Sequence, residues 1–300
     1  MTGIDGSPQE WHSGSMREDT ITVTSGDGIE LQTYRWAPEG EPKAVVQLQH
    51  GLGEHAGRYR RFGEALTNAG YLVYAPDARG SGRTAKGEYS NWGPDGWPGW
   101  VDDLTKLNAR IRADHPGLPV ALFGHSMGSF ASQNWLLDHS ADVDAAVLCG
   151  TTDVAGLVPV LDSPIPADLS TFNAAFEHRT GFEWLSRDEA EVDKYVDDEM
   201  CGWTAQPLKD ISTLAAASDP DQVARVRPDL PILLVAGDAD PINGTGEAVR
   251  LVGQRYRDAG VQDVTVTIYP GARHEILNET NRDDVTADVL AFLDRTVGAA

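Results

Sequence analysis

The sequence has few cysteines and no long apolar run. Its 300 residues include two cysteines, and neither Cys149 nor Cys201 stands near other Cys or His residues at the spacing of a metal site. No uninterrupted apolar stretch approaches the length of a membrane span, and the first 20 residues contain no apolar signal core. We therefore expect a cytoplasmic protein with two free thiols, no bound metal and no integral membrane association.

Positive charge is also scarce. The chain carries 24 basic and 46 acidic residues, which gives a formal net charge of -22. Such a charge repels phosphate backbones and anionic lipid surfaces at long range, so no nucleic-acid partner is expected. The simplest role of the excess acid is to keep the protein soluble. It leaves the oligomeric state undetermined.

What the chain does have is a globular composition and room for a large core. Hydrophobic residues make up 41% and charged residues 23% of the sequence, which is typical of a folded domain. A chain of 300 residues fits one large α/β domain that carries an insertion. Residues 1–18 are expected to form a flexible N-terminal tail, in which Met16 is a second candidate for the natural start.

Strand and helix signals alternate along most of the chain. Strand-like runs at 21–24, 29–36 and 44–50 are rich in β-branched and apolar residues. After them, helical and strand patterns follow one another through the first half of the chain and again in its last third. This order is typical of a mostly parallel sheet with helices on both faces. We predict such a core from residues 19–150 and 213–300.

The alternation breaks between residues 151 and 212. This stretch supplies prolines, aromatic residues and acids but no apolar strand-like run. We predict that it is an insertion that lies over the sheet as a lid. Its segment from Glu183 to Glu199 contains eight acidic residues against Arg187 and Lys194.

One serine stands between two glycines where a strand pattern passes into a helix pattern. Residues 124–128 read Gly-His-Ser-Met-Gly, which fits the G-x-S-x-G turn of serine hydrolases. In such a turn the serine backbone is strained, and side chains two residues before and after it would collide with the neighbouring strand and helix. The pattern predicts that Ser126 presents a free hydroxyl. The alternative is a glycine turn whose serine merely caps the helix.

A serine nucleophile needs a histidine base and an acid that orients the histidine. His274 follows the last strand pattern, and Asp238 and Asp240 follow the strand pattern before it. The chain order serine, acid, histidine is the order of an α/β-hydrolase sheet. Residue reasoning alone leaves the choice between the two aspartates open. The histidines near the serine, expected to make structural hydrogen bonds, are His50, His55 and His125.

The oxyanion of a tetrahedral intermediate needs backbone N–H donors that are held in place. One donor is expected from Met127, directly after the serine. The second is expected from Leu52 in the loop His-Gly-Leu-Gly-Glu-His (50–55), which follows a strand pattern. A glycine turn that only connects strand to helix is the alternative for this loop.

With these residues assembled, the sequence resembles the monoacylglycerol lipase and lysophospholipase branch of the α/β-hydrolases over nearly the whole chain after residue 20. The motifs that carry the resemblance are HGLGEHAGRY (50–59), DARGSG (77–82), HPGLPVALFGHSMGS (115–129), GDADP (237–241) and YPGARHEILNE (269–279). The resemblance implies an α/β-hydrolase fold with an eight-stranded sheet and a lid.

The same resemblance assigns roles to single residues. It places the acid on Asp240 and the oxyanion donors on Leu52 and Met127. It also implies a structural role, in charge pairs that brace the loops, for three charged residues near the site: Glu54, Asp77 and Arg79.

The activity implied by the resemblance is that of a serine carboxylic-ester hydrolase, which forms an acyl-enzyme and needs no cofactor. Monoglycerides, short alkyl esters and aromatic monoesters of the phthalate kind are all open as substrates. A membrane-docking lid would show an apolar or basic face, so the acidic run favours a small soluble ester. Lid residues expected to form the substrate pocket, or else to pack the lid on the sheet, are Leu161, Phe172, Phe176, Trp184 and Trp203.

The sequence leaves two alternatives to the esterase. A proline-releasing aminopeptidase would use the lid acids to hold a substrate ammonium group. A non-catalytic binding protein on the same fold would be expected to have lost a member of the triad, whereas Ser126, Asp240 and His274 are all present.

Overall fold

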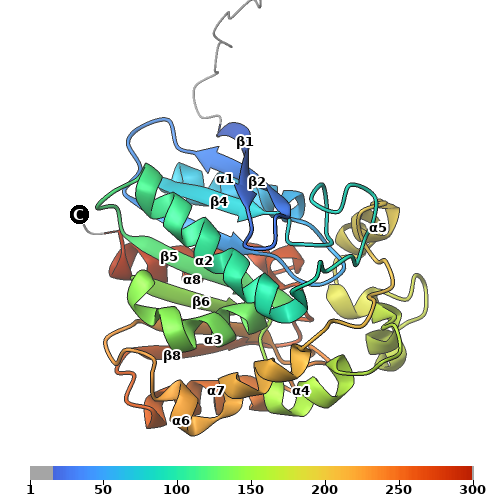
Figure 1. Cartoon of the computed structure of the whole chain (residues 1–300). Coiled ribbons are helices and arrows are strands. Elements are labelled where there is room, and N and C mark those ends of the chain that lie inside the picture. Colours follow the sequence, from blue (N-terminus) through green and yellow to red (C-terminus); the bar gives the residue numbers. More distant parts are fainter. Residues whose placement is uncertain (1–15, 299–300) are drawn as a thin grey trace, which may run out of the picture.

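The computed structural model describes residues 16–298, which form an eight-stranded sheet between two layers of helices (Figure 1). The inner strands are buried on both faces, which explains why their sequences read as continuous apolar runs. In their order across the sheet, the strands are β1 (Arg17–Thr24), β2 (Glu30–Ala37), β4 (Tyr71–Pro76), β3 (Ala44–Gln49), β5 (Val120–His125), β6 (Ala145–Cys149), β7 (Ile232–Gly237) and β8 (Val264–Tyr269).

The sheet is parallel from β4 to β8. Only the edge beside it is antiparallel, where β2 pairs with both β1 and β4. The predicted α/β-hydrolase arrangement, a mostly parallel sheet of eight strands, is confirmed. β1 begins at Arg17, so two residues assigned to the tail belong to the sheet. Met16 precedes β1 and packs against the core, and residues 1–15 of the predicted tail lie outside the described residues.

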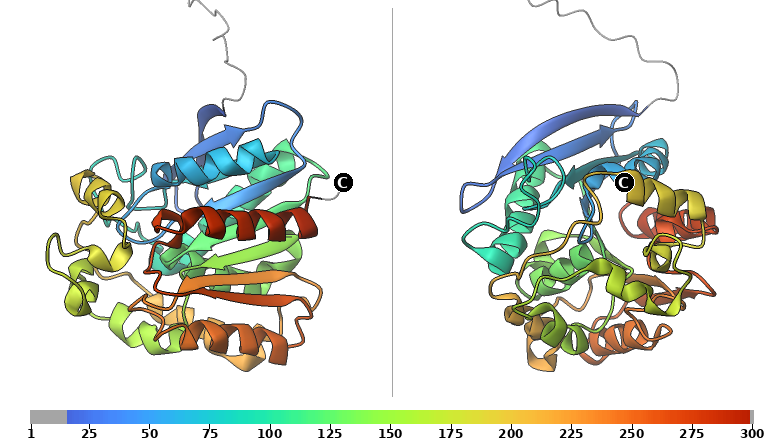
Figure 2. Two further views of the ribbon diagram at one scale, coloured as in Figure 1. Left: turned by 180° about the vertical axis from the view of Figure 1, so that it is seen from behind. Right: turned by 90° about the vertical axis from the view of Figure 1, so that its right-hand side faces the viewer.

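The helices form a layer on each face of the sheet. Helices α1 (Arg60–Asn68) and α8 (Arg282–Thr296) cover one face and lie in front of the sheet in the left view of Figure 2. The opposite face is covered by α2 (Gly96–Asp114), α3 (Met127–His139) and α7 (Glu247–Asp258). The prediction of helices on both faces of the sheet is confirmed, and the core is built from two apolar layers on either side of one sheet.

The sequence predicts a helix over residues 101–115, and α2 begins five residues earlier, at Gly96. Its first turn contains Trp97 and Trp100, which are buried against the sheet. Pro98 lies in the same turn, where the missing amide costs no helical hydrogen bond. Tertiary burial of the two indoles therefore extends the helix into a segment that the sequence pattern left as a loop.

Between β6 and β7 the chain leaves the sheet and builds the insertion, which Figure 1 shows at one end of the strands. We call residues 154–167 the apolar arm and residues 183–198 the acidic arm. The helices of this stretch are α4 (Val154–Leu161), α5 (Glu189–Asp197) and α6 (Pro220–Val223). The short 3-10 turns of the chain are Ala56–Tyr59, Ser140–Asp142, Leu169–Ala175, Glu183–Leu185, Ile211–Ser218 and Ile276–Asn278. None of the described helices is both long and apolar enough to cross a membrane.

Candidate active site

Ser126 lies at the tip of a sharp turn between β5 and α3. Its backbone has φ 51 and ψ -123, a left-handed conformation that is strained for a residue with a side chain. A Cβ atom on Gly124 would lie 2.5 Å from the Gly128 oxygen, and one on Gly128 would lie 2.4 Å from the Gln49 oxygen. The two glycines are therefore required for the turn to form, as the sequence pattern predicts.

The loops after β7 and β8 bring an aspartate and a histidine to this serine. His274 Nε2 lies 2.8 Å from Ser126 Oγ, and His274 Nδ1 lies 2.8 Å from Asp240 Oδ2. The other oxygen of Asp240 accepts the Ile242 amide at 2.9 Å. Asp238, the alternative acid, points elsewhere and accepts the Gly271 amide at 2.6 Å. The structure thus joins Ser126, His274 and Asp240 in one hydrogen-bonded chain.

Asp240 and His274 are buried and Ser126 is half-buried, and this burial affects the electrostatics of the site. Burial lowers the pKa of His274, but the adjacent Asp240 carboxylate outweighs it, so the pKa of His274 is raised above its ordinary value. An ionised carboxylate only accepts hydrogen bonds, so it fixes the proton of the neutral ring on Nδ1. Nε2 is then left as the acceptor that faces the serine hydroxyl.

The loop of residues 50–55 approaches the serine from the other side. Glu54 Oε1 accepts the Gly51 amide at 2.7 Å, and His50 Nε2 accepts the Ala78 amide at 2.9 Å. These bonds fix the loop, which carries Leu52. The amides of Leu52 and Met127 make no hydrogen bond to any residue that the structure describes.

A cavity of about 80 Å³ opens beside Ser126. Of the five pocket residues expected from the sequence, Leu161, Phe172 and Trp184 line it. Phe176 lies outside it, under the guanidinium of Arg273. Trp203 also lies outside, where it stacks on Tyr89 with ring centroids 6.1 Å apart. Apolar wall residues that the sequence did not single out are Phe130, Leu157, Val160, Ala167, Leu169, Leu185 and Ile242.

One end of the cavity is polar. Arg58 contacts Glu54 Oε2 at 2.7 Å and Glu275 Oε2 at 2.7 Å, and both carboxylates line the cavity or its rim. Burial alone would raise the pKa of Glu54, but Arg58 and further donors lower it below its ordinary value. The resemblance marked Glu54 as part of a charge pair, but its partner Arg58 and the second acid, Glu275, were not singled out from the sequence. The spacing of Glu54 and Arg58, four residues apart, was the available signal.

The three histidines expected to be structural lie close to the site without joining the chain of Ser126 and His274. His55 Nδ1 accepts the Gly57 amide and its Nε2 lies 2.8 Å from Asp198. His125 packs on His274 with ring centroids 4.9 Å apart. Burial and the charge of His274 lower the pKa of His125 to about 4, so this ring is neutral at physiological pH.

The charged residues that the resemblance marked as structural are paired, each with a different partner. Arg79 is fully buried and contacts Asp27 at 2.9 Å and Asp103 at 2.8 Å. Asp77 accepts the Ala56 amide at 2.9 Å and lies 3.5 Å from Arg83. These pairs join loops far apart in the chain and so brace the surroundings of the site.

One group among the described residues, His55, Asp198 and Cys201, has ligand atoms close enough together to suit a metal ion. Both ring nitrogens of His55 are already hydrogen-bonded. Burial raises the pKa of the Cys201 thiol, so the thiolate that a metal would need is disfavoured. The group therefore gives no argument for a metal. Cys149 and Cys201 are both free.

The position of the serine, histidine and aspartate at the carboxyl edge of a parallel sheet defines the class of the protein. It is an α/β-hydrolase of the serine ester hydrolase type.

Comparison with known proteins gives the family. A sequence model described as "Serine aminopeptidase, S33" matches residues 40–281, and the chain belongs to this family of α/β-hydrolases. It is 31% identical over 277 residues to a monoacylglycerol lipase of Mycolicibacterium smegmatis, and the match covers 89% of this chain and 95% of the relative. It is 29% identical over 289 residues to human monoglyceride lipase, and the match covers 92% of this chain and 89% of the human protein. A thermostable carboxyl esterase from Bacillus coagulans, solved with glycerol, superposes with a TM-score of 0.82 at 28% identity and covers 94% of this chain and all of its own.

Proposed function

We propose that the protein hydrolyses monoacyl esters with an apolar acyl chain and a small polar alcohol, using Ser126 as nucleophile, His274 as general base and Asp240 as the acid that orients it. The observation that carries the proposal is the position of His274, whose two ring nitrogens lie 2.8 Å from Ser126 and 2.8 Å from Asp240. This is the contact geometry that activation of a serine hydroxyl requires.

The reaction has two halves. His274 accepts the hydroxyl proton as Ser126 Oγ attacks the ester carbonyl, and the resulting imidazolium is stabilised by Asp240. The same ring then gives the proton to the alcohol oxygen as the ester bond breaks. In the second half, His274 activates a water molecule that releases the acid from the acyl-enzyme.

The amides of Leu52 and Met127 are proposed to hold the oxyanion. Two observations support this role. First, neither amide donates to a described residue. Second, the loop that carries Leu52 lies close to the serine, because a Cβ atom added to Gly51 would lie only 3.0 Å from Ser126 Cβ. Donors that are fixed before the reaction starts stabilise the developing charge without reorganisation.

The lining of the cavity suggests the form of the substrate. Leu157, Leu161 and Phe172 line an apolar part that suits an acyl chain, whereas Glu54 and Glu275 belong to a polar end that suits hydroxyl groups. The names of the relatives, monoacylglycerol lipase and monoglyceride lipase, point to the same combination.

We further propose that residues 151–212 act as the lid of this site and that the protein works in the cytoplasm. The lid proposal is supported by the wall residues that both arms contribute to the cavity. The location is supported by the two free thiols, which are typical of a reducing compartment.

The family description names an aminopeptidase, so this activity is the second candidate. It would need a free carboxylate in the cavity to bind the substrate ammonium. The two acids of the polar end, Glu54 and Glu275, are already paired with Arg58. This pairing favours the ester hydrolase.

The test combines covalent labelling with a substrate panel. A fluorophosphonate should label the native protein at Ser126, and Ser126→Ala should not be labelled. p-Nitrophenyl esters and monoglycerides of increasing chain length should be hydrolysed faster than proline and alanine amides. Rapid cleavage of the amides with negligible ester turnover would instead establish the aminopeptidase.

A further inference from the structure

The acidic arm is attached directly to the loop that carries His274. The His274 amide donates to the Trp184 oxygen at 3.2 Å, and the Glu275 amide donates to the Leu185 oxygen at 2.8 Å. The Trp184 indole packs on the imidazole with ring centroids 4.9 Å apart. Two backbone hydrogen bonds therefore join the acidic arm to the loop at His274 itself and at the next residue.

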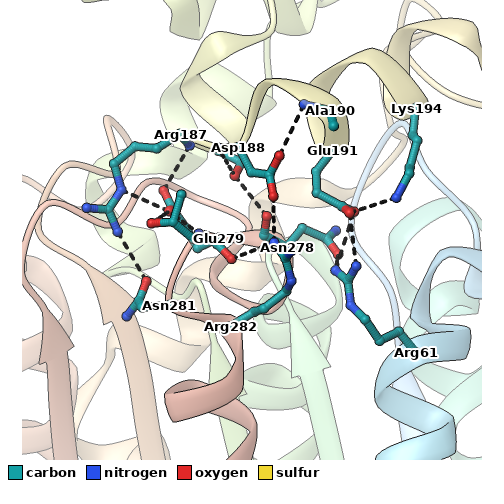
Figure 3. Close-up of polar contacts among 12 residues, drawn as sticks. Arg61, Arg187, Asp188, Ala190, Glu191, Lys194, Asn278, Glu279, Asn281 and Arg282 are labelled. Atoms are coloured by element: carbon teal, nitrogen blue, oxygen red, sulfur yellow. Dashed lines mark hydrogen bonds and ion pairs between the residues drawn. The ribbon is translucent and has the colours of Figure 1, made fainter.

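Glu279 lies at the centre of this attachment (Figure 3) and its side chain is fully buried. Its Oε1 accepts the Arg273 amide at 2.9 Å and the Arg187 amide at 3.1 Å. Its Oε2 accepts Arg187 Nε at 2.8 Å and the Thr280 amide at 2.8 Å. One carboxylate thus binds the residue before His274, the residue after Glu279 and the acidic arm.

The charge state of Glu279 follows from these contacts. Burial alone would raise its pKa, but the amides of Arg273, Thr280 and Arg187 and the Arg187 guanidinium lower it below the ordinary value. The carboxylate is therefore ionised at neutral pH. An ionised acceptor makes stronger hydrogen bonds than a neutral one.

Two further ion pairs extend the attachment to the helices beside the loop, as Figure 3 shows. Asp188 lies 2.7 Å from Arg282 at the start of α8. Glu191 lies 2.9 Å from Arg61 of α1, which also donates to Asn278 Oδ1 at 2.7 Å. The acidic arm is held at three points along its length.

We propose that Glu279 is a positioning residue: by binding the Arg273 amide and Arg187 together, it holds the His274 ring in line with Ser126. This proposal rests on the roles proposed above for Ser126 and His274. Glu279 does not touch the serine, so it acts only through the loop and the arm. A displacement of a catalytic group by about 1 Å can reduce the rate by about 100-fold, so a small loss of support is measurable.

The test uses two variants that weaken the attachment from opposite ends. Glu279→Gln keeps the shape of the side chain but replaces one carboxylate oxygen with an NH₂ group. This group cannot accept the hydrogen bonds that the oxygen accepts from its N–H donors. Arg187→Ala removes the partner on the partly exposed arm and leaves the buried loop contacts in place. Arg187→Lys is the conservative variant, because it keeps the charge but not the fork of donors. Arg179→Ala is the matched control, because Arg179 pairs with Asp193 within the insertion and does not contact the histidine loop.

Three measurements are made on each variant: the rate of Ser126 labelling by a fluorophosphonate, and kcat and KM for p-nitrophenyl butyrate, each per folded protein. We expect Glu279→Gln and Arg187→Ala to lower labelling and kcat by about tenfold or more with KM changed less than about twofold. Arg187→Lys should recover part of the loss, and Arg179→Ala should behave as the native protein does. A purely structural role would lower the melting temperature but leave the labelling rate of the folded fraction unchanged.

The results separate this inference from the proposed function. If the native protein is not labelled at Ser126, the function is wrong. If the native protein is labelled and folded Arg187→Ala is labelled equally fast, the positioning role is overturned, even where Glu279→Gln fails to fold.

Discussion

The two arms of the insertion border the same cavity but are held in opposite ways. In the apolar arm, Val160 and Ile165 are 62% and 72% exposed, and a bridge from Ala167 to Ala205 joins the end of the arm to the rest of the insertion. The acidic arm is tied by ion pairs and backbone hydrogen bonds to α1, to α8 and to the histidine loop. The first arm can open at lower cost than the second, because it breaks fewer buried polar contacts when it moves.

This difference changes the meaning of the acidic run that the sequence displays. Asp188 and Glu191 do not form a free solvated face, because Arg282 and Arg61 bind them. Large exposed apolar side chains lie on both arms, Val160 and Ile165 on the apolar arm and Val196 on the acidic arm. The expectation of a small soluble ester was based on a free acidic run, and two acids of that run are bound by arginines instead.

Both arms line the cavity, the apolar arm through Leu157, Val160, Leu161 and Ala167 and the acidic arm through Trp184, Leu185 and Tyr195. Under the proposals above, the acidic arm has the additional role of supporting the histidine loop.

Substitution of Ser126 or Asp240 should reduce activity more than any other change. This loss is the upper limit for the effect of any variant that acts by displacing His274. Ser126→Ala and Asp240→Asn should each lower kcat for p-nitrophenyl butyrate by about 10⁴-fold, since either change removes the proton-transfer chain. Asp238→Asn is the matched control in the same loop and should retain activity within about threefold. Equal losses in Asp238→Asn and Asp240→Asn would mean that the loop, rather than the contact with His274, is what matters.

Shortening a wall residue of the apolar arm should affect selectivity. Leu161→Ala removes apolar surface from the cavity, so kcat/KM for the octanoyl p-nitrophenyl ester should fall by about tenfold, while the acetyl ester changes by less than about twofold. Labelling of Ser126 by a small fluorophosphonate should be unaffected. A uniform loss across chain lengths would break the division of roles between the arms.

The pH profile distinguishes the arms in a second way. A protonated His274 cannot accept the serine proton, so activity falls as pH drops through its pKa. Because the pKa of His274 is raised, the acid limb of kcat/KM should have its midpoint above the ordinary histidine value of about 6.5. Asp240→Asn should move the midpoint of the residual activity to lower pH, whereas Leu161→Ala should leave it in place. A native midpoint below the ordinary value would contradict this assignment of the base.

The smallest expected effect is the loss of the acidic arm's attachment in acid. The contacts described above lower the pKa values of Glu279, Glu191 and Asp188 in the folded protein. Stability from such groups is present above their unfolded pKa values, near 4, and is lost as pH falls through the lower folded values. Hydrogen exchange, corrected for its intrinsic pH dependence, should show residues 183–198 loosening below about pH 4 by about 1 kcal/mol per pair or less. Residues 154–167 should change little, and equal loosening of both arms would remove the contrast.

Much of the fold follows from local signals. The alternation of strand and helix and the turn at Ser126 were readable, because each depends on residues close together in sequence. The order serine, aspartate, histidine was readable because each residue directly follows a strand pattern. The start of α2 was misplaced, since burial of Trp97 and Trp100 against the sheet overrides the polar pattern. The sequence was sufficient to predict the structure wherever the conformation of a segment depends only on its own residues.

The sequence by itself determined the hydrolase sheet and the serine turn, because periodicity and the need for glycine at a strained turn are properties of short segments. The resemblance already assigned the acid to Asp240. The tertiary structure alone decided that Phe176 and Trp203 lie outside the cavity and that Asp188 and Glu191 of the insertion are bound by arginines. Arg187 and Glu279 are 92 residues apart in the chain, and Arg58 and Glu275 are 217 apart. Contacts over such separations depend on how whole elements pack, so no local pattern encodes them.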